Sequence, residues 1–213
     1  MFEISKLREA KNHLLKYAVV IFDLDDTLYS EKDYVRSGYA EIARHYKSIP
    51  AMEDKLWNAF ENNEQAINYV LKQEGLFSCE AVNHCLDIYR NHQPIISLYP
   101  EAEELFVFLK EHGIHLGMIT DGRPEGQRAK IKALGIEHYF DKIIVTDELG
   151  GVGFRKPNPI AFEKMQIHFN VPYASMVYVG DNAQKDFIAP KLLGMNCVYF
   201  CNPDGLYSTK VFI

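Results

Sequence analysis

Two hydrophobic patterns alternate along most of the chain. Mainly apolar segments predict strands at residues 19–22, 114–120, 143–146, 176–180 and 197–200. The run at 19–22 is unbroken and rich in β-branched and aromatic residues, which suits a strand buried on both faces of a parallel sheet. Apolar residues at helical spacing predict helices at residues 100–111, 124–134 and 159–169, and from about 186 to 194. Because crossover helices usually link parallel neighbours, this alternation predicts an α/β fold with a doubly wound parallel sheet.

Two segments depart from this alternation. Residues 3–16 have a spacing that predicts a short amphipathic helix, with apolar positions at Ile4, Leu7, Leu14 and Leu15. Residues 29–96 contain only helical patterns, and the predicted helices are 31–47, 51–61, 64–74 and 79–92. We therefore expect a core domain of residues 1–28 and 97–213, and a small helical domain of residues 29–96 inserted after the strand at 19–22.

Three acidic residues follow the strand at 19–22 within four positions, in the stretch VVIFDLDDTL. In an extended chain Asp23 and Asp25 share a face, with their Cα atoms roughly 7 Å apart, so their oxygens can flank one small group. Asp26 and Thr27 would then turn the chain out of the sheet. Clustered acids repel each other unless a cation or a bound proton offsets their charge, which argues against a purely structural role.

Two other roles for these acids need to be considered. An EF-hand calcium loop counted from Asp23 would need Gly at its sixth position and Glu at its twelfth, but the chain has Leu28 and Tyr34 there. The sequence therefore excludes that loop. Helix capping, a frequent role of Asp before a turn, stays open for Asp25 or Asp26.

Polar residues also follow the other predicted strands, and ligands of open α/β sheets bind outside the carboxyl ends of strands. The sequence places there Thr120, Asp121 and Gly122, then Lys156 in GFRKPNP, then Asp181 and Asp186 in GDNAQKD. The stretch GGVGFR lacks the third glycine of a dinucleotide-binding loop, so we interpret it as a flexible loop that leads to the lysine. One edge of the sheet is thus expected to collect acids, a hydroxyl, backbone N–H groups and a lysine.

Composition and charge narrow the class of protein. The chain is 47% hydrophobic and 13% aromatic, and its 23 basic and 29 acidic residues give a net charge of −6 without a basic block. Nucleic acid and anionic membranes are therefore poor candidates as partners. The N-terminus MFEISKLREA is unlike a signal peptide and no apolar run has the length of a membrane span, so we expect a cytoplasmic protein. The four cysteines and eight histidines form no metal-binding or redox spacing.

The order and spacing of the polar residues resemble the haloacid dehalogenase-like superfamily of aspartate-based phosphohydrolases. Its D-x-D-x-T motif is matched by Asp23, Asp25 and Thr27, and its strand-end hydroxyl by Thr120. Its lysine is matched by Lys156, and its G-D-x-x-x-x-D motif by Gly180, Asp181 and Asp186. The resemblance implies a Rossmann-like core with an α-helical cap of the superfamily's first class.

The resemblance also implies a role for each matched residue. Asp23 would be the nucleophile and form an aspartyl-phosphate, and Asp25 would protonate the leaving oxygen and later activate water, with a pKa raised by the clustered carboxylates. Mg²⁺ would be held by the carboxylates of Asp23 and Asp181 and by the backbone carbonyl of Asp25. Asp186 would lie outside these direct ligands or contact a metal-bound water. The phosphoryl oxygens would be held by Thr120 with the N–H groups of Asp121 and Gly122, while Lys156 offsets developing charge.

These roles predict a Mg²⁺-dependent phosphatase that acts on a small phosphorylated metabolite, such as a sugar phosphate or a nucleoside monophosphate. A dehalogenase would lack the second acid of the first motif, so Asp25 argues against one. A sugar phosphomutase of the same superfamily remains an alternative. From a different class, a phospho-acceptor receiver or a binding protein without turnover is less compatible with the chain length and with the complete set of motifs.

The helical insert is expected to set specificity. It leaves the core directly after Thr27 and Leu28, so we expect it to form a lid over the strand ends that admits only small leaving groups. The alternative is a helical domain that packs to one side and leaves the site open. Candidates for contact with substrate are Tyr34, Arg36, Tyr39, Trp57, Tyr69 and Arg90. The sequence leaves the oligomeric state open.

Overall fold

The computed structural model describes residues 1–206 and forms two compact units. The first, here called the core unit, comprises Met1–Glu31 and the chain from Ser97 onward, and the second, the helical unit, comprises Lys32–Ile96. We expected the insert to begin at residue 29, but residues 29–31 belong to the core unit.

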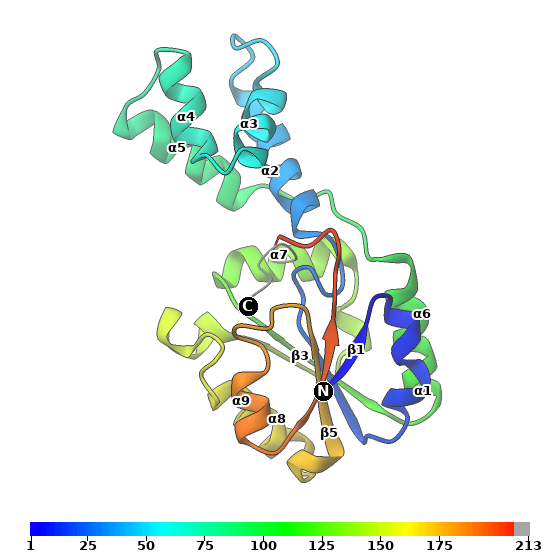
Figure 1. Ribbon diagram of the computed structural model, residues 1–213. Helices are drawn as coiled ribbons and strands as arrows, with labels where there is room; N and C mark the ends of the chain where they lie inside the picture. The colour runs from blue at the N-terminus through cyan, green and yellow to red at the C-terminus, as the bar shows by residue number, and fades with distance from the viewer. Residues whose placement is uncertain (207–213) are drawn as a thin grey trace. The chain divides into compact units, whose positions relative to one another are not determined.

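Within residues 1–206, six strands form a single sheet in the core unit, and every pair of neighbours is parallel (Figure 1). The strands are β1 (Phe2–Ile4), β2 (Val19–Phe22), β3 (His115–Thr120), β4 (Lys142–Val145), β5 (Met176–Gly180) and β6 (Asn196–Phe200). Their order across the sheet is β1-β6-β5-β2-β3-β4. The predicted doubly wound parallel sheet and its five predicted strands are confirmed.

The N-terminal prediction is wrong in part. Residues 3–16 do not form one helix, because the chain begins with β1, continues through a 3₁₀ helix at Leu7–Ala10 and reaches α1 only at Lys11–Leu14. β1 pairs with β6, with Phe2 opposite Val198 and Ile4 opposite Phe200. A strand of three residues is too short to show the period that identifies a strand in a sequence.

Helices cover both faces of the sheet. The core unit contains α1, α6 (Pro100–Glu111), α7 (Pro124–Leu134), α8 (Ile160–Phe169) and α9 (Ile188–Leu192). In Figure 1, α1 and α6 lie on one side of the sheet, and α8 and α9 lie on the other. Further 3₁₀ helices lie at Glu137–Tyr139, Thr146–Leu149, Val152–Phe154 and Tyr173–Ser175.

The continuous apolar run of β2 is explained by packing on both faces. Val19 and Ile21 belong to a buried cluster with Phe162 of α8, whereas the ring of Phe22 meets the ring of Phe106 of α6, with centroids 5.4 Å apart. Successive side chains of a strand point to opposite faces. All four residues of β2 are therefore fully buried, as a central strand of a parallel sheet requires.

The helical unit has a hydrophobic core of its own. Its chain runs through α2 (Glu31–His45, of which the first residue belongs to the core unit), α3 (Met52–Glu61), α4 (Ala66–Gln73) and α5 (Cys79–Asn91). Buried residues such as Ile42, Leu56 and Leu71 come from successive helices. Residues 32–96 thus contain helices and no strand.

The strand order identifies the edge of the core unit where a ligand would bind. From β2 the chain proceeds to β3 and β4 on one side, then returns to β5 and β6 on the other. The switch point lies between β2 and β5, and ligands of open α/β sheets bind at the carboxyl ends of the strands beside such a point.

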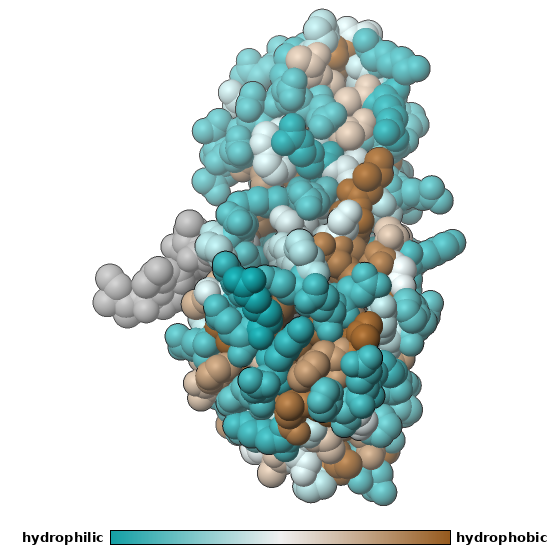
Figure 2. Space-filling view, turned by 90° about the vertical axis from the view of Figure 1, so that its right-hand side faces the viewer, coloured by the Kyte–Doolittle hydropathy of each residue, from teal (hydrophilic) through white to brown (hydrophobic). Residues whose placement is uncertain are grey.

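The surface is mainly hydrophilic on the face drawn in Figure 2, with hydrophobic residues in small scattered groups. Among residues 1–206, no helix combines the length and the apolar character that crossing a bilayer requires.

Candidate active site

Three neighbouring strands end in polar residues at one edge of the sheet. Asp23 follows β2, Thr120 is the last residue of β3, and Asp181 follows β5. β2 lies between β3 and β5. Asp23 continues the sheet by one residue, because its N–H donates to the carbonyl of Val179 at 2.9 Å. These three residues, which the sequence placed at strand ends, are therefore brought together.

Lys156 reaches this edge from the segment between β4 and α8. Its Nζ lies 2.7 Å from Oδ1 of Asp23 and 2.8 Å from Oδ1 of Asp186. It also donates to the hydroxyl of Tyr178 at 2.8 Å. Burial lowers the pKa of this lysine, but the charges of Asp186 and Asp23 outweigh burial and hold the pKa well above its ordinary value. The lysine is therefore a fixed cation between two acids.

Asp23, Asp181 and Asp186 form a buried group, and one carboxylate oxygen of each lies within 4.8 Å of the others. Burial raises the pKa of Asp23 to about 7, although Lys156 partly offsets it. Burial and the charges of Asp23 and Asp186 raise the pKa of Asp181 to about 9. One lysine beside three acids leaves negative charge in excess, and three converging carboxylates are ligands that suit a hard divalent cation. The residues therefore fit a magnesium site.

Gly180 at the end of β5 permits the close approach of Asp186. A Cβ atom at position 180 would lie 2.5 Å from Oδ2 of Asp186. The same oxygen accepts the N–H of Asn182 at 2.9 Å. The turn after β5 thus positions Asp186 next to Lys156 and Asp181.

The carboxylate of Asp25 contacts a different set of residues. Its Oδ1 accepts a hydrogen bond from Nζ of Lys130 at 2.8 Å and another from the hydroxyl of Tyr29. Its Oδ2 accepts from Nε2 of Gln127 at 2.8 Å. Burial alone would raise the pKa of Asp25, but the Lys130 charge and these hydrogen bonds outweigh it, so the pKa is lowered. The expected raised pKa is wrong, because a lysine from α7 supplies the compensating charge.

Both carboxylate oxygens of Asp121 contact other residues of the core unit. Its Oδ1 accepts from the hydroxyl of Thr146 at 2.9 Å and from the N–H of Lys156 at 3.0 Å. Its Oδ2 lies 3.3 Å from Nζ of Lys185. The side chain therefore fixes the segment that carries Lys156, and the expected phosphate contact of Asp121 would fall to its backbone. Gly122 beside it has φ of +143°, a conformation that favours glycine.

Asp26 contacts the start of a helix, the capping role that the sequence left open for Asp25 or Asp26. Its Oδ1 accepts the N–H of Glu31, the first residue of α2, at 2.8 Å, and its Oδ2 accepts the N–H of Leu206 at 2.7 Å. Asp26 is thus the acid that holds the start of a helix, and Asp25 is not. Thr27 donates its hydroxyl to Oδ1 of Asp181 at 3.2 Å, which ties the first motif to the fourth.

A cavity of about 390 Å³ opens among these residues in the core unit. Its lining includes Asp23, Asp25, Asp121, Gly122, Lys156 and Asp181, which were expected, and also Glu31, Gln127, Lys130, Arg155, Asn182 and Lys185, which were not. Asn182 and Lys185 lie inside the GDNAQKD segment, so their neighbours in the sequence could have indicated them. Gln127 and Lys130 lie on a helix, where a polar residue ordinarily indicates a solvated face.

The segment GGVGFR is more ordered than the flexible loop that we expected. It contains the 3₁₀ helix Val152–Phe154, and a second 3₁₀ helix, Thr146–Leu149, precedes it. Arg155 then forms two hydrogen bonds of 2.7 Å with the carboxylate of Asp147. This pairing braces the segment just before Lys156.

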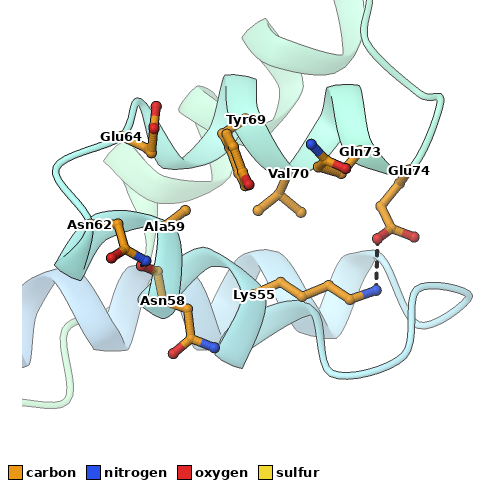
Figure 3. Close-up of a pocket in the computed structure, with 9 residues that line it drawn as sticks. All are labelled: Lys55, Asn58, Ala59, Asn62, Glu64, Tyr69, Val70, Gln73 and Glu74. Atoms are coloured by element: carbon orange, nitrogen blue, oxygen red, sulfur yellow. Dashed lines mark hydrogen bonds and ion pairs between the residues drawn. The ribbon is translucent and has the colours of Figure 1, made fainter.

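A second hollow, of about 630 Å³, lies in the helical unit between α3 and α4 (Figure 3). Tyr69 and Val70 point into it from α4, and Lys55 crosses its floor to an ion pair of 2.7 Å with Glu74. Of the six specificity candidates, Tyr34 and Tyr39 are buried in the helical unit, and the Arg36 guanidinium lies over the Trp57 ring. The candidate active site is the smaller cavity, because the motif acids and Lys156 line it.

Comparison with known proteins gives matches that cover most of the chain. The model of the family described as haloacid dehalogenase-like hydrolase matches residues 20–200. A glyceraldehyde 3-phosphate phosphatase of Methanocaldococcus jannaschii is 30% identical over 194 residues, covering 83% of this chain and 81% of that protein. The enzyme of the same name from Pyrococcus abyssi is 29% identical over 197 residues, covering 85% and 80%.

A crystal structure of a Bacillus subtilis protein, described as a HAD-hydrolase bound to magnesium, has a similar fold. It superposes with a TM-score of 0.65 at 20% identity, over 93% of this chain and 90% of that chain.

Proposed function

The chain belongs to the haloacid dehalogenase-like hydrolases, and from that premise we propose that it is a Mg²⁺-dependent phosphatase acting on a small phosphorylated metabolite. The observation that carries this proposal is the convergence of Asp23, Lys156 and Asp181 on one cavity of the core unit. The buried Asp186 lies behind them, within 4.8 Å of both acids and 2.8 Å from Lys156. Relatives named glyceraldehyde 3-phosphate phosphatase support a phosphorylated sugar or similar small metabolite as substrate.

Asp23 would be the nucleophile. One of its oxygens attacks phosphorus as the bond to the leaving oxygen breaks, so an aspartyl-phosphate forms. The Lys156 ammonium, 2.7 Å from Oδ1 of Asp23, would hold this carboxylate in its ionised form and offset charge on the phosphoryl oxygens. Thr120 at the end of β3, with the N–H groups that follow it, would hold the same oxygens.

The proposed metal ligands are Asp23, Asp181 and the backbone carbonyl of Asp25, with Asp186 in support. When bound, Mg²⁺ would neutralise part of the repulsion between an attacking carboxylate and a phosphate dianion. Burial first, and neighbouring carboxylates second, raise the pKa values of Asp23 and Asp181, and a divalent cation at these oxygens would offset the buried negative charge.

Asp25 would exchange protons with the leaving group and with water. It would take up a proton when substrate binds, give it to the leaving oxygen in the first step, and take one from the water that hydrolyses the aspartyl-phosphate in the second. Its lowered pKa favours the carboxylate form, which is the form that activates water. The contacts to Lys130, Gln127 and Tyr29 support a fixed orientation for both steps.

The test is phosphate release with and without Mg²⁺. We expect release from small substrates such as glyceraldehyde 3-phosphate, sugar phosphates and nucleoside monophosphates, and loss of release in excess chelator. Asp23→Asn should abolish turnover, because an amide cannot form the aspartyl-phosphate, while circular dichroism still reports a folded protein. Full turnover in chelator would contradict the metal assignment, and an active Asp23→Asn variant would require another nucleophile.

A further inference from the structure

Two residues of α7 donate hydrogen bonds to the carboxylate of Asp25, one to each oxygen. Lys130 donates to Oδ1 at 2.8 Å, and Gln127 donates to Oδ2 at 2.8 Å. With the Tyr29 hydroxyl also on Oδ1, both oxygens of Asp25 have donors in the core unit. A carboxylate that is held at both oxygens by donors from rigid elements has little freedom to rotate.

The two α7 residues are buried at this position. Gln127 is 3% exposed and Lys130 is 5% exposed, although both side chains are usually found at the surface. Residues three positions apart lie on the same face of a helix, so one face of α7 presents both donors. Burying a lysine is costly unless a partner compensates its charge. Asp25 is such a partner here, so the fold places a buried cation against this carboxylate.

Gln127 also reaches the phosphate side of the site. Its Nε2 donates to the hydroxyl of Thr120 as well as to Asp25, and so links the ends of β3 and β2. Gly122 leaves room for this side chain, since a Cβ atom there would lie 3.1 Å from Gln127. One amide thus bridges the proton-transfer group and the group that would hold the phosphoryl oxygens.

We propose that Gln127 and Lys130 are positioning residues that orient Asp25 for proton transfer to the leaving oxygen. This inference rests on the proposed phosphatase function. Asp25 takes up a proton from water when substrate binds. As the bond from phosphorus to the leaving oxygen breaks, this proton moves to that oxygen, and Asp25 returns to the carboxylate that Lys130 and Gln127 hold in place. A displacement of about 1 Å at such a group can reduce the rate of the step by about 10²-fold.

The test compares two esters that differ in their need for a proton. Phenyl phosphate releases a strongly basic phenolate, whereas 4-nitrophenyl phosphate releases a weakly basic one that needs little protonation. We expect Lys130→Met and Gln127→Met each to reduce kcat/KM for phenyl phosphate by about 10²-fold, and to reduce that for 4-nitrophenyl phosphate far less. kcat/KM is the appropriate quantity, because it reports the steps up to release of the leaving group.

Lys132→Met is the matched control, since Lys132 lies on the same helix and is exposed. It should change kcat/KM for neither ester. Equal losses on both esters in the Lys130 and Gln127 variants would overturn the inference and leave the phosphatase function intact. If Lys130→Met fails to fold, Gln127→Met carries the comparison, and failure of both to fold would assign the pair a structural role instead. Wild-type protein that releases phosphate neither from these two esters nor from sugar phosphates and nucleoside monophosphates would overturn the proposed function itself.

Discussion

Asp181 is buried at the end of β5 beside two further carboxylates, and this has a consequence for stability. Its pKa rises from an ordinary value of 3.8 to about 9, because of burial and the charges of Asp23 and Asp186. The folded state therefore binds the proton of Asp181 more tightly than the unfolded state does. Where the folded state binds more protons, the free energy of unfolding falls as pH rises. For Asp181 this fall extends from about pH 4 to about pH 9.

We expect Asp181→Asn to flatten the pH dependence of unfolding of the metal-free protein, because the amide cannot ionise. Urea unfolding in chelator at pH 5, 7 and 9 measures it, and Asp204→Asn, at an exposed acid, is the control. Wild-type protein should lose stability over this range and recover part of it on addition of Mg²⁺. A variant with the same pH dependence as the wild type would show that Asp181 is not the group responsible.

The residues of the candidate site differ in how far the sequence could indicate them. Asp23, Thr120 and Asp181 follow apolar runs, so the rule that ligands bind at strand ends was sufficient to group them. Gln127 and Lys130 could not be found in this way, because they come from a helix and reach the site only through the packing of α7. The clustered acids alone would raise the pKa of Asp25, but Lys130 pairs with Asp25 and lowers it, so the direction expected from the sequence is wrong.

At the scale of elements, the end of β5 depends on the absence of a side chain at Gly180. A Cβ atom there would lie 2.5 Å from Oδ2 of Asp186, so Gly180→Ala must displace either the strand end or the carboxylate. We expect a loss of about 1–3 kcal/mol in the free energy of unfolding, together with weaker Mg²⁺ binding measured by calorimetry.

Gly153→Ala is the control for this substitution, because a Cβ atom at position 153 has no atom within 4 Å to contact. It should change neither the free energy of unfolding nor Mg²⁺ affinity. A Gly180→Ala protein with wild-type affinity for Mg²⁺ would show that Asp186 can move without consequence for the metal.

The elements themselves were largely predictable where a pattern is long enough to read. The run Val19–Phe22 identified a buried strand, and Pro190 did not exclude a helix, since α9 begins at Ile188 and places the proline in its first turn. β1 was missed, because three residues at the edge of the sheet are determined by pairing with β6 and not by their own pattern. The sequence therefore predicted the elements that bury much apolar surface better than those held mainly by backbone pairing.

At the scale of the whole molecule, the chain leaves the core unit for the helical unit directly after a residue that lines the cavity. Glu31 lines the cavity and is the last residue of the core unit before Lys32 begins the helical unit. We therefore expect the helical unit to limit the size of the leaving group. Specificity constants for sugar phosphates should exceed those for phosphopeptides whose leaving groups have matched pKa values. A clear preference for phosphopeptides would contradict this expectation and would indicate a site open to macromolecules.

The two segments that join the helical unit to the core unit are paired with each other inside the core unit. Tyr99 donates its N–H to the carbonyl of Leu28 at 2.8 Å, and Tyr29 forms an antiparallel bridge with Leu98. Residues 32–96 therefore close a loop whose ends the core already holds together. The free-energy cost of closing a loop grows slowly, by about 0.6 kcal/mol for each doubling of the loop's length. Evolution can thus lengthen, shorten or exchange this insert at little cost to the core, which makes the junction a natural point for recombination between related chains.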